Sequence, residues 1–177
     1  PSRRRGALMP LPRGEIDYEI GTDVRMNALE EGTRTVKETL DVTQGKLVMG
    51  FRLGESMEEP DTAALTVFNA AFGGGTSSKL FANVRERLQL CYYAGSLVDV
   101  HKGLLLVSSG IEFDKFEAAR DEILAQLAAI ARGEVSDEEL MSVKMGVASE
   151  LRAMTDSQGE LEGFTLTQAL DGVYYGP

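Results

Sequence analysis

The sequence predicts an α+β fold, a two-layer sandwich in which helices cover one face of an antiparallel or mixed sheet. Large apolar residues recur at every second position from Leu47 to Leu53, a period that is typical of a strand with one buried face. Two further apolar segments, 92–100 and 104–111, flank the turn 101–103 and predict a β-hairpin. Helical patterns follow the last strand, so the helices are expected to pack on one face of the sheet.

The chain is expected to form one α+β domain, residues 33–177, after an irregular lead-in, residues 1–32. Prolines and glycines interrupt every pattern in the lead-in, although residues 16–20 fit a short edge strand. A hydrophobic share of 43% in 177 residues is enough for a core. No closing strand follows the last helical pattern, so we expect the domain to be truncated at its C-terminus.

The charge balance excludes two kinds of partner. Twenty-eight acidic and 18 basic residues give a formal net charge of −10, which repels nucleic-acid phosphates and anionic lipids. No apolar run approaches the ~20 residues that a membrane-spanning helix needs. We therefore expect no nucleic-acid or membrane partner. A cytoplasmic location agrees with the single cysteine, since disulfides are rare in that compartment.

Metal-binding and nucleophilic side chains are scarce. The chain has one cysteine, Cys91, and one histidine, His101. These two residues cannot supply the several His and Cys ligands of a usual zinc site, so we expect no cofactor in this chain. His101 falls in the predicted hairpin turn, where a solvent-exposed residue is the simplest interpretation. Cys91 begins a strand and is expected to be a small buried residue.

Residues 33–88 contain an extended segment and two helices. Val36, Leu40 and Val42 suggest the extended segment. A helix is expected from Pro60, because proline suits a first helical turn, and Gly73-Gly74-Gly75 ends it. Its core-facing stripe comprises Leu65, Phe68 and Phe72. Ser77 or Ser78 caps the next helix, whose apolar face comprises Leu80, Phe81, Val84 and Leu88.

Three more helices are expected after the hairpin. Capping boxes begin the first two, Asp114 with Glu117 and Ser136 with Glu139, and Gly133 ends the first of them. The stripe of the first comprises Phe116, Ala119, Ile123, Leu127 and Ile130. The stripe of the second comprises Leu140, Val143, Val147, Leu151 and Met154. The third helix covers residues 158–170, with Leu161, Phe164 and Leu170 inward.

The glycine turn begins a series of motifs. Residues 73–81 read Gly-Gly-Gly-Thr-Ser-Ser-Lys-Leu-Phe, residues 84–86 read Val-Arg-Glu, and residues 90–92 read Leu-Cys-Tyr. The segments 44–48 and 136–140 add Gln-Gly-Lys-Leu-Val and Ser-Asp-Glu-Glu-Leu. In order and spacing these motifs resemble the insulinase and pitrilysin class of zinc metallopeptidases, which includes the mitochondrial processing peptidases. The resemblance covers roughly residues 36–172.

The resemblance points to the half of such enzymes that is not catalytic. The catalytic half carries the zinc motif His-x-x-Glu-His, and nothing in this chain matches it. The resemblance therefore implies an inactive domain of a bacterial peptidase that closes a peptide-binding chamber. Its expected partners are a zinc-bearing catalytic half, fused or separate, and a peptide substrate; a homo-oligomer is also possible. The alternative is a purely structural partner domain without substrate contact.

Arg85 and Tyr92 are the candidate substrate-binding residues that the resemblance implies. An arginine can hold a carbonyl or carboxylate, and a tyrosine hydroxyl can donate to a developing oxyanion. From the residues alone, the alternative is an exposed helix arginine paired with Glu86 and a tyrosine that anchors a strand. Tyr93 is the rival of Tyr92, but the motif register favours Tyr92. A nucleotide-binding glycine loop is disfavoured, because Lys79 does not follow the last glycine as a P-loop requires.

Overall fold

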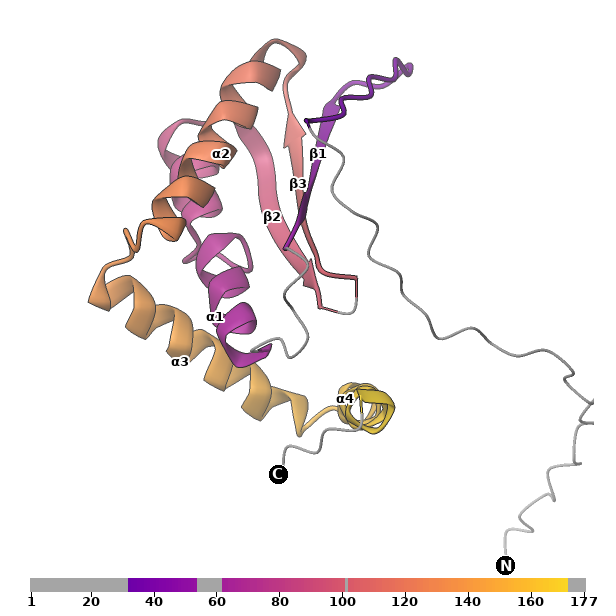
Figure 1. Cartoon of the computed structure of the whole chain (residues 1–177), viewed down its shortest axis with the longest axis vertical. Coiled ribbons are helices and arrows are strands. Elements are labelled where there is room, and N and C mark those ends of the chain that lie inside the picture. Colours follow the sequence, from indigo (N-terminus) through magenta and orange to yellow (C-terminus); the bar gives the residue numbers. More distant parts are fainter. Residues whose placement is uncertain (1–31, 54–61, 101, 172–177) are drawn as a thin grey trace, which may run out of the picture.

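The computed structural model describes residues 32–53, 62–100 and 102–171 (Figure 1). Its elements in chain order are β1 (Gly45–Arg52), α1 (Thr62–Phe72), the π-helix η1 (Leu80–Arg87), β2 (Cys91–Asp99), β3 (Leu104–Ile111), the 3-10 helix η2 (Phe113–Lys115), α2 (Phe116–Ala131), α3 (Asp137–Met154) and α4 (Gln158–Asp171). The predicted edge strand at 16–20, the helix start at Pro60, the turn residue His101 and the side chain of Leu170 lie outside the described residues.

The three strands form one antiparallel sheet in the order β1-β3-β2, which confirms the predicted strand and hairpin. β3 lies in the centre, with Arg52 of β1 and Asp99 of β2 both opposite its first residue, Leu104. Gly103 closes the hairpin turn: its φ is 57°, and its N–H donates to the Val100 carbonyl at 3.2 Å. A positive φ is easily adopted by glycine, which has no Cβ. The extended segment 33–42 forms no strand, and its apolar side chains are exposed.

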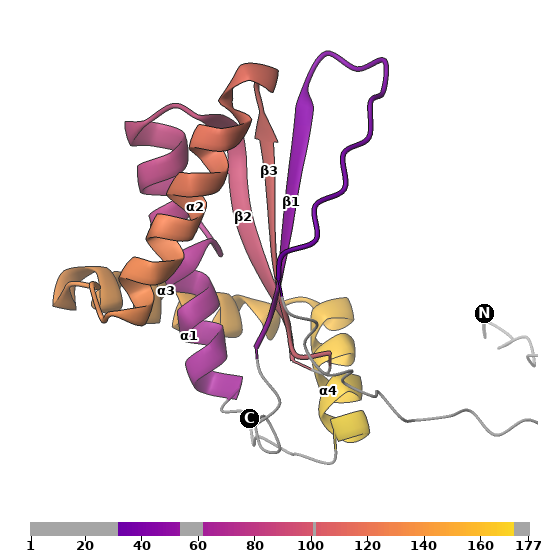
Figure 2. The same ribbon diagram turned by 45° about the horizontal axis from the view of Figure 1, so that its top comes forward.

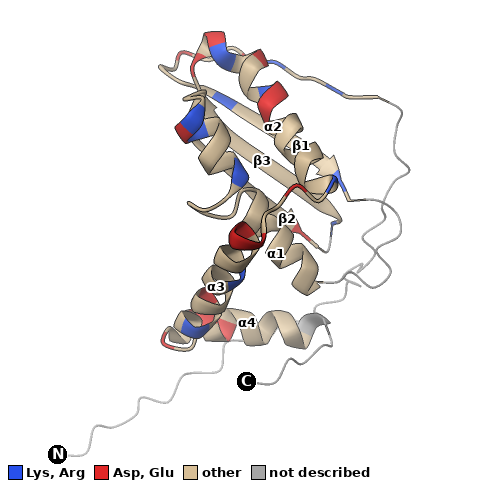
Figure 3. Ribbon diagram, turned by 90° about the vertical axis from the view of Figure 1, so that its left-hand side faces the viewer, with Lys and Arg blue, Asp and Glu red and all other residues tan. Residues whose placement is uncertain are grey.

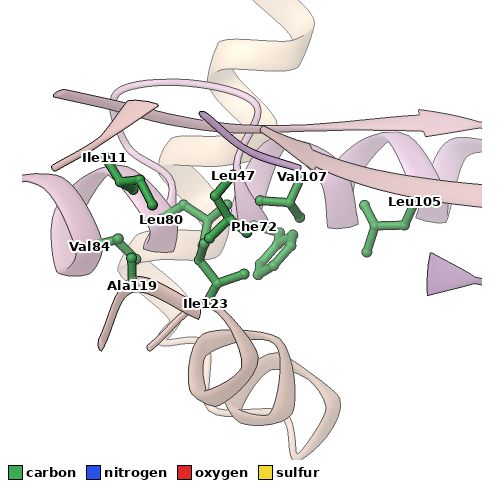
Figure 4. Packing of buried hydrophobic residues seen from close by; sticks show 9 residues of the cluster. All are labelled: Leu47, Phe72, Leu80, Val84, Leu105, Val107, Ile111, Ala119 and Ile123. Carbon is green, nitrogen blue, oxygen red and sulfur yellow. The ribbon is translucent and has the colours of Figure 1, made fainter. Parts of the chain in front are cut away.

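Helices cover one face of the sheet, which confirms the predicted two-layer α+β architecture. The strand side chains that point toward the helices alternate with exposed ones: Leu47 is buried, whereas Val48 is 58% exposed. Figure 4 shows the resulting core, in which side chains from the strands meet those of α1, η1 and α2. Its buried members are Leu47, Phe72, Leu80, Val84, Leu105, Val107, Ile111, Ala119 and Ile123.

The predicted position of the second long helix is wrong. Of the two long helices, α2 contributes Ala119 and Ile123 to the sheet core, whereas α3 packs against α1. In Figure 2, α3 and α4 gather at the lower end of the sheet while α2 runs alongside it. As a result Leu151 is 50% exposed, although Val143 in the same stripe is buried. Leu161, expected to face inward from α4, is also exposed.

The ends of the long helices only partly follow the predicted capping. The Ser136 box of α3 is confirmed: Glu139 N–H donates to the Ser136 hydroxyl at 3.1 Å, and Ser136 N–H donates to the Glu139 carboxylate at 2.8 Å. The box predicted at Asp114 is wrong, because η2 occupies this position and no side chain caps α2. Phe116, at the start of α2, is consequently exposed. Gly133 ends α2 with a φ of 78°, as expected.

Candidate functional site

The glycine turn fixes the start of η1 against the edge of β2. Gly73 N–H donates to the Asn69 carbonyl at 2.9 Å, and the Gly73 carbonyl accepts from Ser96 N–H at 3.1 Å. A Cβ at Gly73 would lie 2.6 Å from the backbone nitrogen of Ser96 and 2.9 Å from the Leu80 side chain. Only glycine allows this approach of the turn to the strand. The turn therefore sets where η1 begins, as the helix-stop interpretation predicts.

η1 begins at a serine cap and winds as a π-helix. Ser78 is fully buried, and its hydroxyl accepts from Phe81 N–H at 3.3 Å, which confirms the predicted cap. Leu80 and Val84 face the core as predicted, but Leu88 is 42% exposed. The wider turn of a π-helix changes which side chains share a face, and η1 ends before Leu88.

An irregular connection leads from η1 into β2. Gln89 has a φ of 48°, and its carbonyl accepts from the Lys115 ammonium at 3.1 Å. The pairing of β2 with β3 then shifts between Cys91 and Tyr93, a β-bulge that leaves Tyr92 without a paired residue. A left-handed residue and a bulge within four positions redirect the chain, and such irregularities are common beside functional sites.

These irregularities bring Arg85 and Tyr92 to the same place. Both line one hollow of about 360 Å³, together with Glu86, Gln89, Cys91, Glu112 and Lys115. Arg85 comes from η1, Tyr92 from the bulge of β2, and Lys115 from η2. The structure thus places the two sequence-predicted residues in the lining of one surface hollow, from two different elements.

Among the described residues, the Arg85 guanidinium contacts an aromatic ring and forms no hydrogen bond. Its Cζ lies 4.6 Å from the centre of the Phe81 ring, a cation–π contact. Its Nε is 3.6 Å from the Glu86 carboxylate, which is longer than a hydrogen bond. The Arg85 side chain is 42% exposed. The guanidinium is therefore partly exposed to solvent, and Arg85 lines the hollow.

Tyr92 and Tyr93 have different surroundings. Tyr92 is 60% exposed and lines the hollow. The Tyr93 hydroxyl instead lies 3.3 Å from the Ser108 hydroxyl, and its ring covers Gly110, where a Cβ would come within 2.5 Å of the ring. Tyr93 therefore supports the outer face of the sheet, and it does not line the hollow.

Cys91 is half-buried and lines the hollow. Burial raises the pKa of the Cys91 thiol above its ordinary value of 9.0, while a hydrogen bond with Ser109 and the charge of Arg85 act in the opposite direction. The thiol is thus protonated near neutral pH and is a poor nucleophile. The described residues contain no group of three or more His, Cys, Asp or Glu side chains that could hold a metal ion. The residues that the structure describes therefore do not fit a catalytic zinc.

Sequence reasoning did not identify Glu112 and Lys115 as residues that line the hollow. Lys115 lies four positions after the last residue of β3, yet its ammonium donates to a carbonyl 26 positions earlier in the chain. It also pairs with the Glu112 carboxylate at 3.1 Å. The signal available in the sequence was a lysine just after a strand, which is common on surfaces. Only the antiparallel pairing of β2 with β3 places it beside the η1 connection.

The similarity to known proteins covers the part of the chain that builds the hollow. A family model described as the inactive domain of peptidase M16 matches residues 22–147. This chain belongs to that family. The match extends over all the residues that build the hollow, and it confirms the resemblance that the motifs predicted. Within the described residues, no helix of the M16 domain has both the length and the apolar character needed to cross a membrane.

Several bacterial proteins are similar to the M16 domain. "Probable inactive metalloprotease YmfF" of Bacillus subtilis is 41% identical over 129 residues, covering 73% of this chain and 30% of that protein. An uncharacterized zinc protease of Rickettsia felis is 27% identical over 113 residues, covering 63% of this chain and 27% of that protein. The chain therefore spans about a third or less of these relatives.

Two solved structures share the fold. A conserved protein from Enterococcus faecalis V583 superposes with a TM-score of 0.66 at 29% identity, covering 73% of this chain and 30% of that one. A protease from Helicobacter pylori superposes with a TM-score of 0.67 at 21% identity, covering 74% of this chain and 32% of that one. The second likeness concerns the fold alone.

Proposed function

We propose that this M16 domain closes a peptide-binding chamber and contacts the substrate with Arg85 and Tyr92, opposite a zinc-bearing catalytic half. The observation that carries the proposal is the shared hollow: two donors from different elements converge there, and neither is used up by a hydrogen bond among the described residues. The catalytic half is expected on the same polypeptide or on a separate subunit, and it would supply the zinc. The cytoplasmic location stays a prediction.

The chemistry assigns a different role to each side chain. Water attack on a peptide carbonyl develops negative charge on the oxygen, and a tyrosine hydroxyl within hydrogen-bonding reach stabilises it. Arginine stays charged at all accessible pH values, so Arg85 can hold the peptide beside that carbonyl through its planar donors. Tyr92 would act on the reacting group, whereas Arg85 would fix the position of the peptide.

The test uses the assembled peptidase. Tyr92→Phe removes one hydroxyl, and the loss of such a donor typically costs on the order of 10²–10³ in rate. Arg85→Gln should raise KM more than it lowers kcat, because it removes binding that is present before the reaction. Tyr93→Phe is the matched control, since its hydroxyl faces Ser108 outside the hollow.

Association of the two halves is measured in parallel, by analytical ultracentrifugation or by co-purification. Near-normal turnover in both Tyr92→Phe and Arg85→Gln, with intact association, would refute substrate contact. It would leave the structural partner domain as the function.

A further inference from the structure

Lys115 and Arg85, the two cationic residues that line the hollow, differ in how many contacts their charged groups make with the protein. The Lys115 ammonium donates to the Gln89 carbonyl and pairs with Glu112, both at 3.1 Å. Among the described residues, the Arg85 guanidinium makes only two such contacts: a loose ion pair with Glu86 at 3.6 Å and a cation–π contact with the Phe81 ring. Lys115 therefore holds the connection between η1 and β2 in place. Arg85 is the cation of the hollow that is available to a ligand.

The Glu86 carboxylate lies beside the Arg85 guanidinium without forming a tight ion pair. Its carboxylate is 57% exposed and adjacent in sequence to Arg85, and the 3.6 Å separation from Nε exceeds a charge-assisted hydrogen bond of about 2.7–2.9 Å. An exposed pair of this kind contributes little to stability. A ligand that brings its own carboxylate can replace Glu86 charge for charge, whereas a neutral carbonyl cannot.

We infer that the hollow is a subsite for a carboxylate of a bound peptide, which displaces Glu86 and takes two donors of the Arg85 guanidinium. The planar fork of a guanidinium matches the two oxygens of a carboxylate. The cation–π contact with Phe81 holds the plane of that fork, and Tyr92 lines the same hollow, where its hydroxyl stays available to the reacting carbonyl. This inference rests on the proposed peptide contact and adds the chemical class that is recognised.

The carboxylate has two possible sources, the C-terminus of the peptide or the side chain of an internal Asp or Glu. Four peptides of one core sequence separate them: free acid or amide at the C-terminus, each with an internal Glu or Gln. Binding to the 177-residue chain is followed by two-dimensional NMR at low salt. We expect the peptide with the productive carboxylate to bind roughly tenfold more tightly than its neutral counterpart. Added salt should reduce this difference, because the hollow is open to solvent.

Three variants test the geometry. Arg85→Gln should abolish the preference for the carboxylate. Glu86→Gln should strengthen binding of the carboxylate peptides several-fold, because it removes both the competitor and a repelling charge. Arg87→Gln is the matched control: it removes the same charge from the same helix, but Arg87 pairs with Glu122 at 3.1 Å and does not line the hollow.

Each outcome is decisive. A carboxylate preference that Arg85→Gln removes and Glu86→Gln enhances supports the inference. Equal binding of acid and neutral peptides overturns the carboxylate subsite and leaves peptide contact standing. The carboxylate subsite is also overturned if Glu86→Gln weakens peptide binding, or if Arg87→Gln removes the carboxylate preference as Arg85→Gln does. If no peptide perturbs the residues of the hollow, both the subsite and the proposed peptide contact are wrong.

Discussion

Replacing Gly73 by alanine tests how the glycine turn positions the candidate site. The added methyl group would lie 2.6 Å from both the backbone nitrogen and the hydroxyl oxygen of Ser96, and 2.9 Å from Leu80. A backbone atom cannot turn away as a flexible side chain can, so the turn itself must move. The move breaks the bond from Ser96 N–H to the Gly73 carbonyl, now 3.1 Å.

The cost follows from two contributions. Overpacking of a well-packed site costs about 1–3 kcal/mol. A lost backbone hydrogen bond adds about 0.5–1.5 kcal/mol. We therefore expect Gly73→Ala to lower the free energy of unfolding by about 2–4 kcal/mol. Because Leu80 begins η1, the same move should also displace Arg85 and weaken peptide binding.

The assay is equilibrium unfolding in urea, read by circular dichroism. Gly75→Ala is the matched control, because a Cβ there meets no atom within 4 Å. It should be neutral or slightly stabilising, since alanine restricts the unfolded chain. If Gly73→Ala unfolds within about 0.5 kcal/mol of Gly75→Ala, the close approach of the turn to β2 does not stabilise the fold and the reasoning is refuted.

Three further predictions concern stability and metal binding. Ile123→Ala should lower the free energy of unfolding by about 2–5 kcal/mol, because the side chain is fully buried. Leu151→Ala should change it by less than about 0.5 kcal/mol, because that side chain is 50% exposed. Equal losses in urea unfolding would contradict the observed packing of α3. The backbone N–H of Ser136, with help from Lys79, holds the pKa of Glu139 below its ordinary 4.5. The stability that Glu139 contributes is therefore complete above that value and is lost as the pH falls through its lower folded pKa, so Glu139→Gln should flatten the acid side of the curve of stability against pH. After dialysis, the purified chain should retain well under one zinc ion per molecule, and a tight stoichiometric zinc would contradict this.

Local patterns predicted the strands and most helix boundaries, because these depend on near neighbours in sequence. Strand alternation follows from the two-residue period of the pleat, and the 104–111 strand was predicted with its observed limits. The Ser136 box needs only four consecutive residues, and it is present as predicted.

Packing partners could not be predicted in the same way. An apolar stripe shows that a helix has a buried face, but it does not show what covers that face. The sequence therefore predicts that the apolar stripe of α3 packs on the sheet, whereas in the structure α3 packs on α1. The far end of the stripe, at Leu151, is exposed to solvent. Figure 3 places the charged residues mainly on the helices, while the strands carry few.

The candidate site depends on backbone conformations that a regular pattern does not encode. Leu88 N–H donates five residues back to the Asn83 carbonyl, and Leu90 N–H donates six residues back to the Val84 carbonyl, so η1 ends in widened turns. Gln89 then adopts a left-handed φ, which is unfavourable for a residue with a Cβ. Each irregularity rotates the following side chains, and together they bring two residues seven positions apart to one hollow. A regular α-helix and an unbulged strand would be easier to form, but they would point Arg85 and Tyr92 in other directions. The site is therefore expected to be among the least stable parts of the sheet edge, and Lys115, which holds the Gln89 carbonyl, is the residue that keeps it in shape.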